Sequence, residues 1–189
     1  MNKILAISTM GALLAGGLFA ADMFVNTPAP ILDKVGGKSI AELFIGAKVK
    51  TGAEQNGYVE VTYTGFVPGE TPNAYAKVGV LEHDITATNP KSFKLIKKHK
   101  DDYDNEWDEV TLKGFVKKDA LVGDIGIIHK AGENLFKERC GGCHALHGYD
   151  EFSANVWPSV VESMIGNSAL TGKEVQTLNR FLQSKAPTE

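Results

Sequence analysis

The sequence of 189 residues contains only two cysteines and has no strong excess of charge, glycine or proline. Two cysteines cannot form the framework of a disulfide-rich scaffold. Collagen-like, low-complexity and disordered chains require compositional biases that are absent here. The formal net charge is only −3 at pH 7. This charge lacks the strong positive excess that is typical of nucleic-acid-binding proteins, so we expect no nucleic-acid partner.

The first 21 residues have the layout of a secretory signal peptide. Lys3 supplies a positive charge, residues 4–21 carry no charge, and Ala20 and Ala21 place small residues at the cleavage point. We therefore expect residues 1–21 to be removed and the mature protein to be exported. An uncleaved membrane anchor is the alternative, because this apolar run just reaches the length that spans a bilayer. No later segment of the sequence is apolar over such a length.

Residues 22–122 have the pattern of short β-strands separated by turns. Residues 58–64 alternate between two faces, and this period of two predicts a half-buried strand. Residues 109–116 repeat the Thr-x-x-Gly-Phe-Val ending of residues 59–67. From the short strands and these Gly-Phe-Val corners we predict an SH3-like small β-barrel, with an insertion near residues 68–108.

The expected insertion contains a sharp change of charge. Lysines dominate residues 91–100, and aspartates and glutamates dominate residues 101–109. Two interpretations are open. The segment is either a solvent-exposed excursion whose two ends neutralise each other, or a docking patch that orients a partner protein.

Residues 123–189 have the pattern of a small helical unit. We expect helices over residues 131–139, 155–165 and 171–185. The last of these opens with the capping box Thr171-x-x-Glu174. The spacing i, i+3, i+4 and i+7 places four apolar residues on one face of the middle helix, namely Trp157, Val160, Val161 and Met164. A unit of about 60 residues buries little surface by itself, so it needs a large apolar group at its centre.

The motif Cys140-Gly-Gly-Cys143-His144 supplies such a group. In c-type attachment the two thiols form thioethers with the vinyl groups of haem, and the adjacent histidine becomes the proximal ligand of the iron. We therefore expect one covalently bound haem c, held by Cys140 and Cys143, with His144 on the iron.

Three other uses of this motif are chemically possible. A thioredoxin-like redox pair is expected within a βαβ pattern, which does not surround these cysteines. A structural zinc site needs four ligands, and His147 alone does not complete the set. The third alternative is a structural disulfide between Cys140 and Cys143. Export, the following histidine and the flanking helices favour the haem.

The sixth ligand of the iron decides the chemistry of such a site. Met164 is the only methionine after the motif, and it shares the inward helix face with Trp157. Its other interpretation is ordinary core filling. We favour Met164 as the distal ligand, because methionine and histidine together suit an electron carrier. The histidine alternatives are His83, His99, His129 and His147.

Four segments of the sequence resemble the C-terminal region of the pentahaem cytochromes that donate electrons to trimethylamine-N-oxide reductase. These segments are residues 107–122, 132–136, 140–146 and 155–164. The resemblance implies a monohaem unit that passes electrons to a periplasmic molybdenum enzyme, with His144 and Met164 on the iron. The sequence has no other Cys-x-x-Cys-His motif. The resemblance therefore implies that an upstream quinol-oxidising cytochrome or complex supplies its electrons.

Together these patterns predict a two-domain α+β protein. An N-terminal SH3-like small β-barrel (residues 22–122) precedes an all-α class I-like cytochrome c domain (residues 123–189). The predicted function is single-electron transfer in the periplasm to a terminal reductase, of the molybdenum S- or N-oxide type, without catalysis by the chain itself. Two alternatives stay open. One is a peroxidase-like haem enzyme or sensor with an open sixth site, and the other is a module whose β domain binds a protein or cell-wall peptide.

Overall fold

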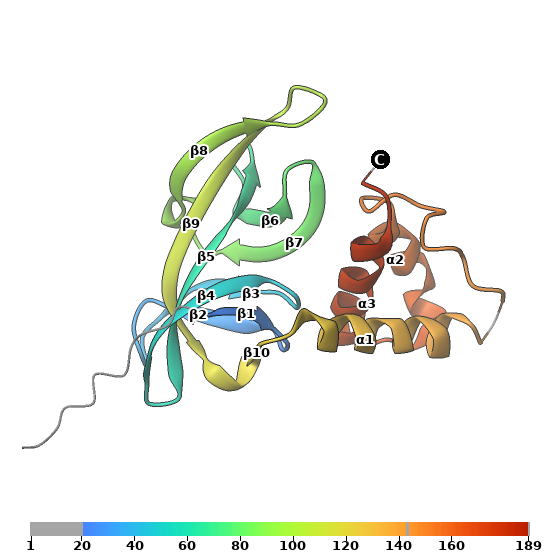
Figure 1. Ribbon diagram of the computed structural model, residues 1–189, viewed down its shortest axis with the longest axis horizontal. Helices are drawn as coiled ribbons and strands as arrows, with labels where there is room; N and C mark the ends of the chain where they lie inside the picture. Colours follow the sequence, from blue (N-terminus) through green and yellow to red (C-terminus); the bar gives the residue numbers. More distant parts are fainter. Residues whose placement is uncertain (1–20, 143, 189) are drawn as a thin grey trace, which may run out of the picture.

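A computed structural model describes residues 21–142 and 144–188, in which a β-sheet and a group of helices lie side by side (Figure 1). The predicted signal peptide lies, up to residue 20, outside the described residues. The strands form a single antiparallel sheet. They are β1 (Asp22–Val25), β2 (Ala29–Leu32), β3 (Ser39–Leu43), β4 (Lys48–Gln55), β5 (Tyr58–Pro68), β6 (Asn73–Lys77), β7 (Val80–Ala87), β8 (Lys94–Lys100), β9 (Glu106–Lys117) and β10 (Leu121–Val122).

The long strands β5 and β9 organise the sheet. They pair in antiparallel register along the whole of β5, from Tyr58 opposite Lys117 to Pro68 opposite Trp107. The order of the strands is β10-β1-β4-β5-β6-β7-β3-β2-β9-β8. Because β5 also pairs with β9, the strands from β5 to β9 in this order close into a ring. The remaining strands extend from the two long ones.

The predicted alternation in β5 is confirmed. Val59, Val61 and Tyr63 are buried, and the residues between them are more exposed. These side chains belong to a core of small and branched apolar residues contributed by almost every strand. The similar segments that end in Gly-Phe-Val lie in β5 and β9, so the two parts of the internal repeat are antiparallel neighbours.

The predicted fold class is wrong. The chain is mostly antiparallel sheet, with ten strands, and only three α-helices occur in residues 21–142 and 144–188. It is not an SH3-like small barrel followed by an all-α class I-like cytochrome c domain. Residues 68–108 supply β6, β7 and β8, which join the same sheet instead of interrupting it. Strand pairing between distant segments, which leaves little trace in local sequence, accounts for the error.

The charge contrast of this segment is explained by a hairpin of β8 and β9. Lys98 lies 3.1 Å from Asp108 and 3.6 Å from Glu106 across the two strands. Lys100 lies 3.1 Å from Asp104 in the connecting turn. Lysines of β8 thus pair with acidic residues of the following turn and of β9. This pairing agrees with the interpretation in which the two ends of the segment neutralise each other.

The helices are α1 (Ile125–Leu135), α2 (Trp157–Ser168) and α3 (Gly172–Lys185). α1 begins earlier than predicted, because the side chain of Asp124 accepts a hydrogen bond from the Gly126 N–H and caps it. The predicted capping box of α3 is confirmed, with reciprocal hydrogen bonds between Thr171 and Glu174. No helix within the described part of the chain has the length and hydropathy needed to cross a membrane.

Arg180 of α3 joins the helices to the sheet. Its side chain is 6% exposed and lies 2.8 Å from the Glu82 carboxylate and 2.7 Å from that of Asp84, both on β7. Its Nε donates to the backbone carbonyl of Ile45 at 2.9 Å. Burial raises the pKa of Asp84, while the nearby guanidinium opposes this shift. A buried cation thus holds together two segments that are far apart in the sequence.

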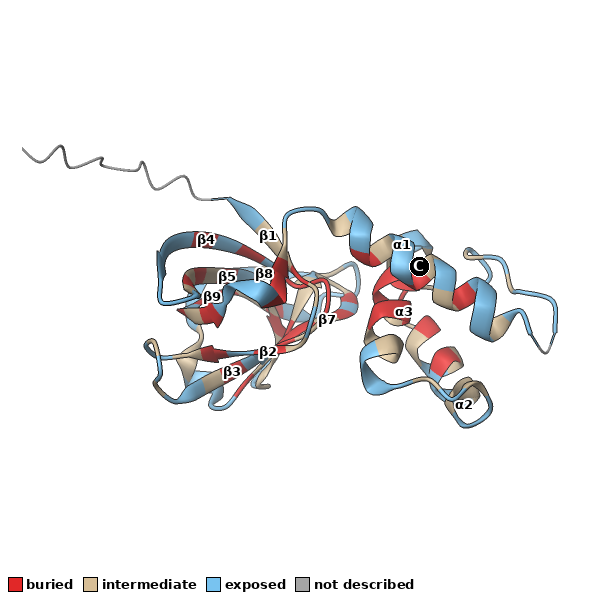
Figure 2. Ribbon diagram, turned by 90° about the horizontal axis from the view of Figure 1, so that it is seen from below, coloured by how far each residue is buried: buried red, intermediate tan, exposed pale blue. Residues whose placement is uncertain are grey.

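The surroundings of Arg180 are closely fitted. Gly46 has a φ of +86°, and an added Cβ would lie 2.3 Å from the Arg180 Nε, so only glycine suits this turn. The phenol of Tyr63 donates to Asp84 at 3.2 Å. Gln183, one turn further along α3, donates to the carbonyls of Leu81 and Ala154. α3 is buried on several sides (Figure 2), and Arg180 and Gln183 are among the residues through which it contacts the sheet.

Replacement of Arg180 by alanine is expected to destabilise the protein strongly. Arg180→Ala leaves Glu82 and Asp84 buried without their cation, a change that typically costs about 3–5 kcal/mol. Urea unfolding of the protein and the variant measures this loss. Lys118→Ala is the control, because its pair with Glu54 is exposed on both sides and is worth about 1 kcal/mol or less. Equal effects of the two substitutions would contradict the role given to Arg180.

The free energy of unfolding is also expected to decrease as the pH is lowered, because of His83. Its ring stacks on Phe44 at 4.2 Å, and burial, followed by the charge of Arg180, lowers its pKa from 6.5. The folded state therefore favours the neutral ring, and the unfolded state takes up the proton first as pH falls below 6.5. The free energy of unfolding is measured at neutral and at mildly acidic pH. Its decrease between the two pH values should be smaller in His83→Asn than in the unmodified protein. The same decline in both would contradict this assignment.

Candidate functional site

A largely apolar cavity lies among the helices. Its volume is about 390 Å³, and α2, α3 and the turn after α1 form its walls. It opens beside a buried cluster that includes Trp157, Leu178 and Leu182. The lining residues are Phe136, Arg139, Cys140, His144, His147, Trp157, Val160, Val161, Met164, Asn167, Ser168, Leu170, Leu178 and Leu182.

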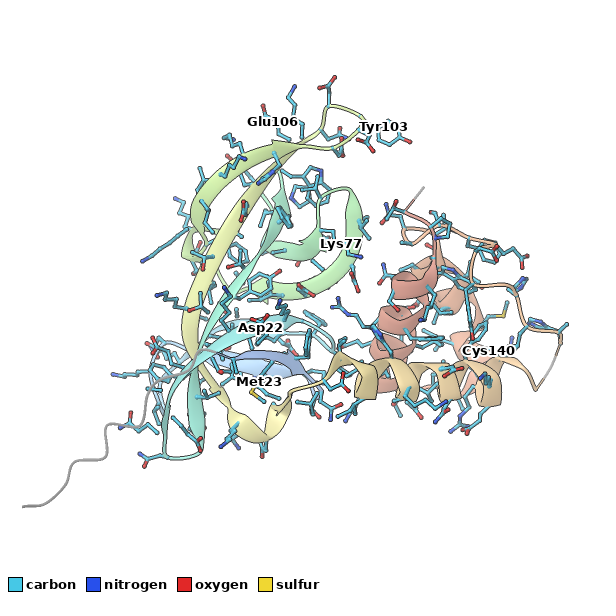
Figure 3. All side chains as sticks on the ribbon, viewed as in Figure 1. Asp22, Met23, Lys77, Tyr103, Glu106 and Cys140 are labelled. Atoms are coloured by element: carbon cyan, nitrogen blue, oxygen red, sulfur yellow. The ribbon has the colours of Figure 1, made fainter. Side chains whose placement is uncertain are left out.

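Cys140 reaches this cavity from a π-helical turn. α1 runs directly into the turn Phe136–Cys140, and Gly141 follows it. Single π-helical turns are rare, and those found within α-helices frequently lie at functional sites. Cys140 is half-buried, and burial raises the pKa of its thiol, so the sulfur stays protonated. Figure 3 shows it at the far end of the α1 segment, away from the sheet. Cys143, the second predicted attachment residue, lies outside the described residues.

His144 also lines the cavity. Its Nδ1 lies 2.7 Å from the backbone carbonyl of Ala145, which can only accept a hydrogen bond, so Nδ1 carries the proton. In a neutral ring this arrangement leaves the lone pair on the other nitrogen, Nε2, which is the atom that can then bind a metal.

Met164 lies on the predicted face of α2. All four apolar residues assigned to that face from the sequence are among the residues that line the cavity: Trp157, Val160, Val161 and Met164. Met164 is half-buried in the wall. The structure therefore brings Cys140, His144 and Met164 to one cavity, although Met164 is well separated from the motif in sequence.

The other histidines divide into two groups. His147 lines the cavity together with His144. His83 and His99 belong to strands β7 and β8, and His129 of α1 lines a separate surface depression. Of the histidine alternatives, only His147 is therefore placed at this cavity within residues 21–142 and 144–188. Sequence reasoning gave this residue no role beyond that of an alternative ligand.

Packed aromatic side chains form part of the cavity wall. Trp157 is 1% exposed, and its Nε1 donates to the carbonyl of Tyr149 at 3.0 Å. Phe136 meets Trp157 edge to face at a centroid distance of 6.0 Å. α1 and α3 approach so closely here that a Cβ on Gly132 would lie 2.4 Å from the Cβ of Phe181. Dense packing therefore fixes the walls of the cavity. These walls are largely apolar and present a thiol, an imidazole and a thioether, a set of groups that fits the haem implied by the motif.

Part of the chain is similar to known cytochrome c-type proteins. It is 34% identical over 83 residues to the cytochrome c-type protein TorY of Haemophilus influenzae, which is 44% of this chain and 23% of that protein. It is 31% identical over 86 residues to TorY of Escherichia coli O157:H7, or 46% of this chain and 23% of that protein. It is 32% identical over 85 residues to the cytochrome c-type protein TorC of Escherichia coli K12, or 45% of this chain and 22% of that protein.

The chain therefore spans less than a quarter of the length of these curated relatives. No protein-family model and no solved structure matches it. What the comparisons establish is a similarity to c-type cytochromes that covers nearly half of the chain.

Proposed function

We propose that this protein is a periplasmic monohaem c-type cytochrome that carries single electrons to a terminal reductase. Cys140 and Cys143 would hold the haem covalently, His144 would be the proximal ligand of the iron and Met164 the distal one. The acceptor would be a molybdenum reductase of S- or N-oxides, of the type that reduces trimethylamine-N-oxide or dimethyl sulfoxide. An upstream quinol-oxidising cytochrome or complex would be the donor.

One observation carries most of the weight. Cys140, His144 and Met164 line the same largely apolar cavity, although they come from a π-turn, a loop and a separate helix. Similarity to the cytochrome c-type proteins TorY and TorC adds independent support. If the motif and the methionine met at one cavity by chance, there would be no reason for the chain also to be similar to c-type cytochromes.

Each residue has a task that follows from its place. The thiol of Cys140 would bond to the haem edge and fix the group in the cavity. His144 would offer its Nε2 to the iron, because its Nδ1–H is engaged by the carbonyl of Ala145. Met164 would offer a neutral thioether from α2, and the buried Trp157 and Leu178 would exclude water from this side. A bound haem c supplies one-electron exchange at its iron, with a potential that methionine ligation raises.

The proposed division of labour follows the chain. Residues 1–21 would act as a cleaved export signal, residues 22–122 would form a β-rich part, and residues 123–189 would carry the haem. The β-rich part supports the haem-binding part through Arg180, whose guanidinium meets Glu82 and Asp84 of β7. Electron exchange with partners needs only a transient and small interface.

Haem attachment and the identity of the distal ligand can be tested together. The protein expressed with export and c-type maturation should carry one haem that resists acid–acetone extraction, and Cys140→Ala or Cys143→Ala should reduce its yield. Met164→Ala should remove the absorption band of the sulfur–iron(III) bond and lower the midpoint potential, since methionine ligation raises it.

Ser163→Ala is the matched control for Met164→Ala, because Ser163 is an exposed neighbour on α2. It should keep both the absorption band and the potential. A wild-type spectrum without the sulfur–iron band, or one that Met164→Ala leaves unchanged, would remove Met164 from the proposal and favour a haem with an open sixth site.

The proposed acceptor can be tested by stopped-flow kinetics. The reduced cytochrome should be reoxidised rapidly by a periplasmic S- or N-oxide reductase from the same organism when its oxide substrate is present. Reoxidation should be absent without the substrate. Slow, substrate-independent oxidation by every such reductase would exclude this acceptor, whereas the haem proposal would be unaffected.

A further inference from the structure

The loop after the haem-attachment motif contains a series of rings that ends at His144. The rings of His144 and His147 meet edge to face at a centroid distance of 5.6 Å. His147 meets Phe152 in the same way at 5.2 Å, and Phe152 meets Trp157 at 5.1 Å. Trp157 is almost completely buried at the cavity wall. Ring contacts thus connect an exposed histidine to the rigid core of the helices.

His147 is held from a second direction by Glu151. The carboxylate of Glu151, four residues further along the loop, lies 2.8 Å from the Nδ1 of His147. A carboxylate bonded to one ring nitrogen fixes the rotation of an imidazole. His147 is therefore fixed by a hydrogen bond at one edge and by an aromatic contact with Phe152.

His144 has much weaker support of its own. It is exposed, and its hydrogen bond is made to the carbonyl of Ala145, the next residue in the same loop. A bond to an adjacent residue moves with the loop and cannot by itself fix the ring relative to the cavity. Among the described residues, the ring of His147 contacts that of His144 and relates it to the helices.

We propose that His147, held by Glu151 and Phe152, is a positioning residue that sets the ring orientation of His144 at the cavity. This inference rests on the proposed haem site, in which His144 is the proximal ligand. The potential of a haem iron depends on the groups around its ligands as well as on the ligands themselves. His147 and Glu151 would thus adjust the potential of the cytochrome without touching the iron.

The test uses the full mature protein with its haem attached. His147→Ala and Glu151→Gln are compared with Asp150→Asn, which removes the same charge from the adjacent, exposed position. Low-temperature electron paramagnetic resonance of the oxidised protein reports ligand orientation through its g-values, and a redox titration gives the midpoint potential. His147→Ala and Glu151→Gln should shift both quantities, and Asp150→Asn should leave the g-values unchanged.

His147→Phe separates ring contact from general packing. It keeps a ring beside His144 but cannot bond to Glu151, so its g-values should lie between those of the wild type and His147→Ala. Wild-type g-values and potential in His147→Ala, or g-value shifts as large in Asp150→Asn as in Glu151→Gln, would overturn the proposal. The haem content of the wild-type protein is measured first, before any variant is compared. A wild-type protein that binds no haem would refute the proposed function instead of the role of His147.

Discussion

The ion cluster around Arg180 is the constraint on which the arrangement of the molecule depends. One guanidinium faces two carboxylates on β7, and all three side chains are less than a tenth exposed. Removing such charges from water is costly, and only close contact with opposite charges and further hydrogen bonds offsets that cost. Arg180 has these contacts only when α3 lies in one position against the sheet. The cluster therefore specifies how the two groups of elements fit together.

α3 transmits this constraint to the candidate site. Leu178 and Leu182 line the cavity, whereas Arg180 and Gln183 on the other side of the helix contact the sheet. Side chains two positions apart on a helix point in nearly opposite directions. One helix therefore serves as a wall of the cavity and as the attachment to the sheet. The β-rich part supports the site mechanically, even though no strand residue is among those that line the cavity.

Structural features that depend on neighbouring residues could be predicted from the sequence, whereas those that depend on contacts between distant segments could not. The period of two in β5 and the capping box of α3 depend on neighbouring residues, and the structure has both. The same holds for the apolar face of α2, because a helix brings residues three and four apart together. Closure of the sheet by β5 and β9 depends instead on pairing between segments about 50 residues apart. That pairing is absent from any local pattern, so the predicted fold class was wrong.

The site shows the same division. The motif spacing singled out Cys140 and His144, and the helix face shared with Trp157 singled out Met164, the only methionine after the motif. The structure places these three at one cavity. No local pattern indicates that Arg180 is buried, since its carboxylate partners lie almost 100 residues earlier. The ring series from Trp157 to His144 was also invisible, because it depends on how one loop folds back on the helices.

The position of α3 in the chain has a consequence for the order of assembly. The ten strands of residues 21–142 all precede it, so the two carboxylates of β7 are synthesised well before the cation that they contact. Chains that emerge from their N-terminus tend to fold in that order. The sheet can therefore reach its final stability only when the last helix docks. The same event completes the cavity, so sheet and cavity mature in one step.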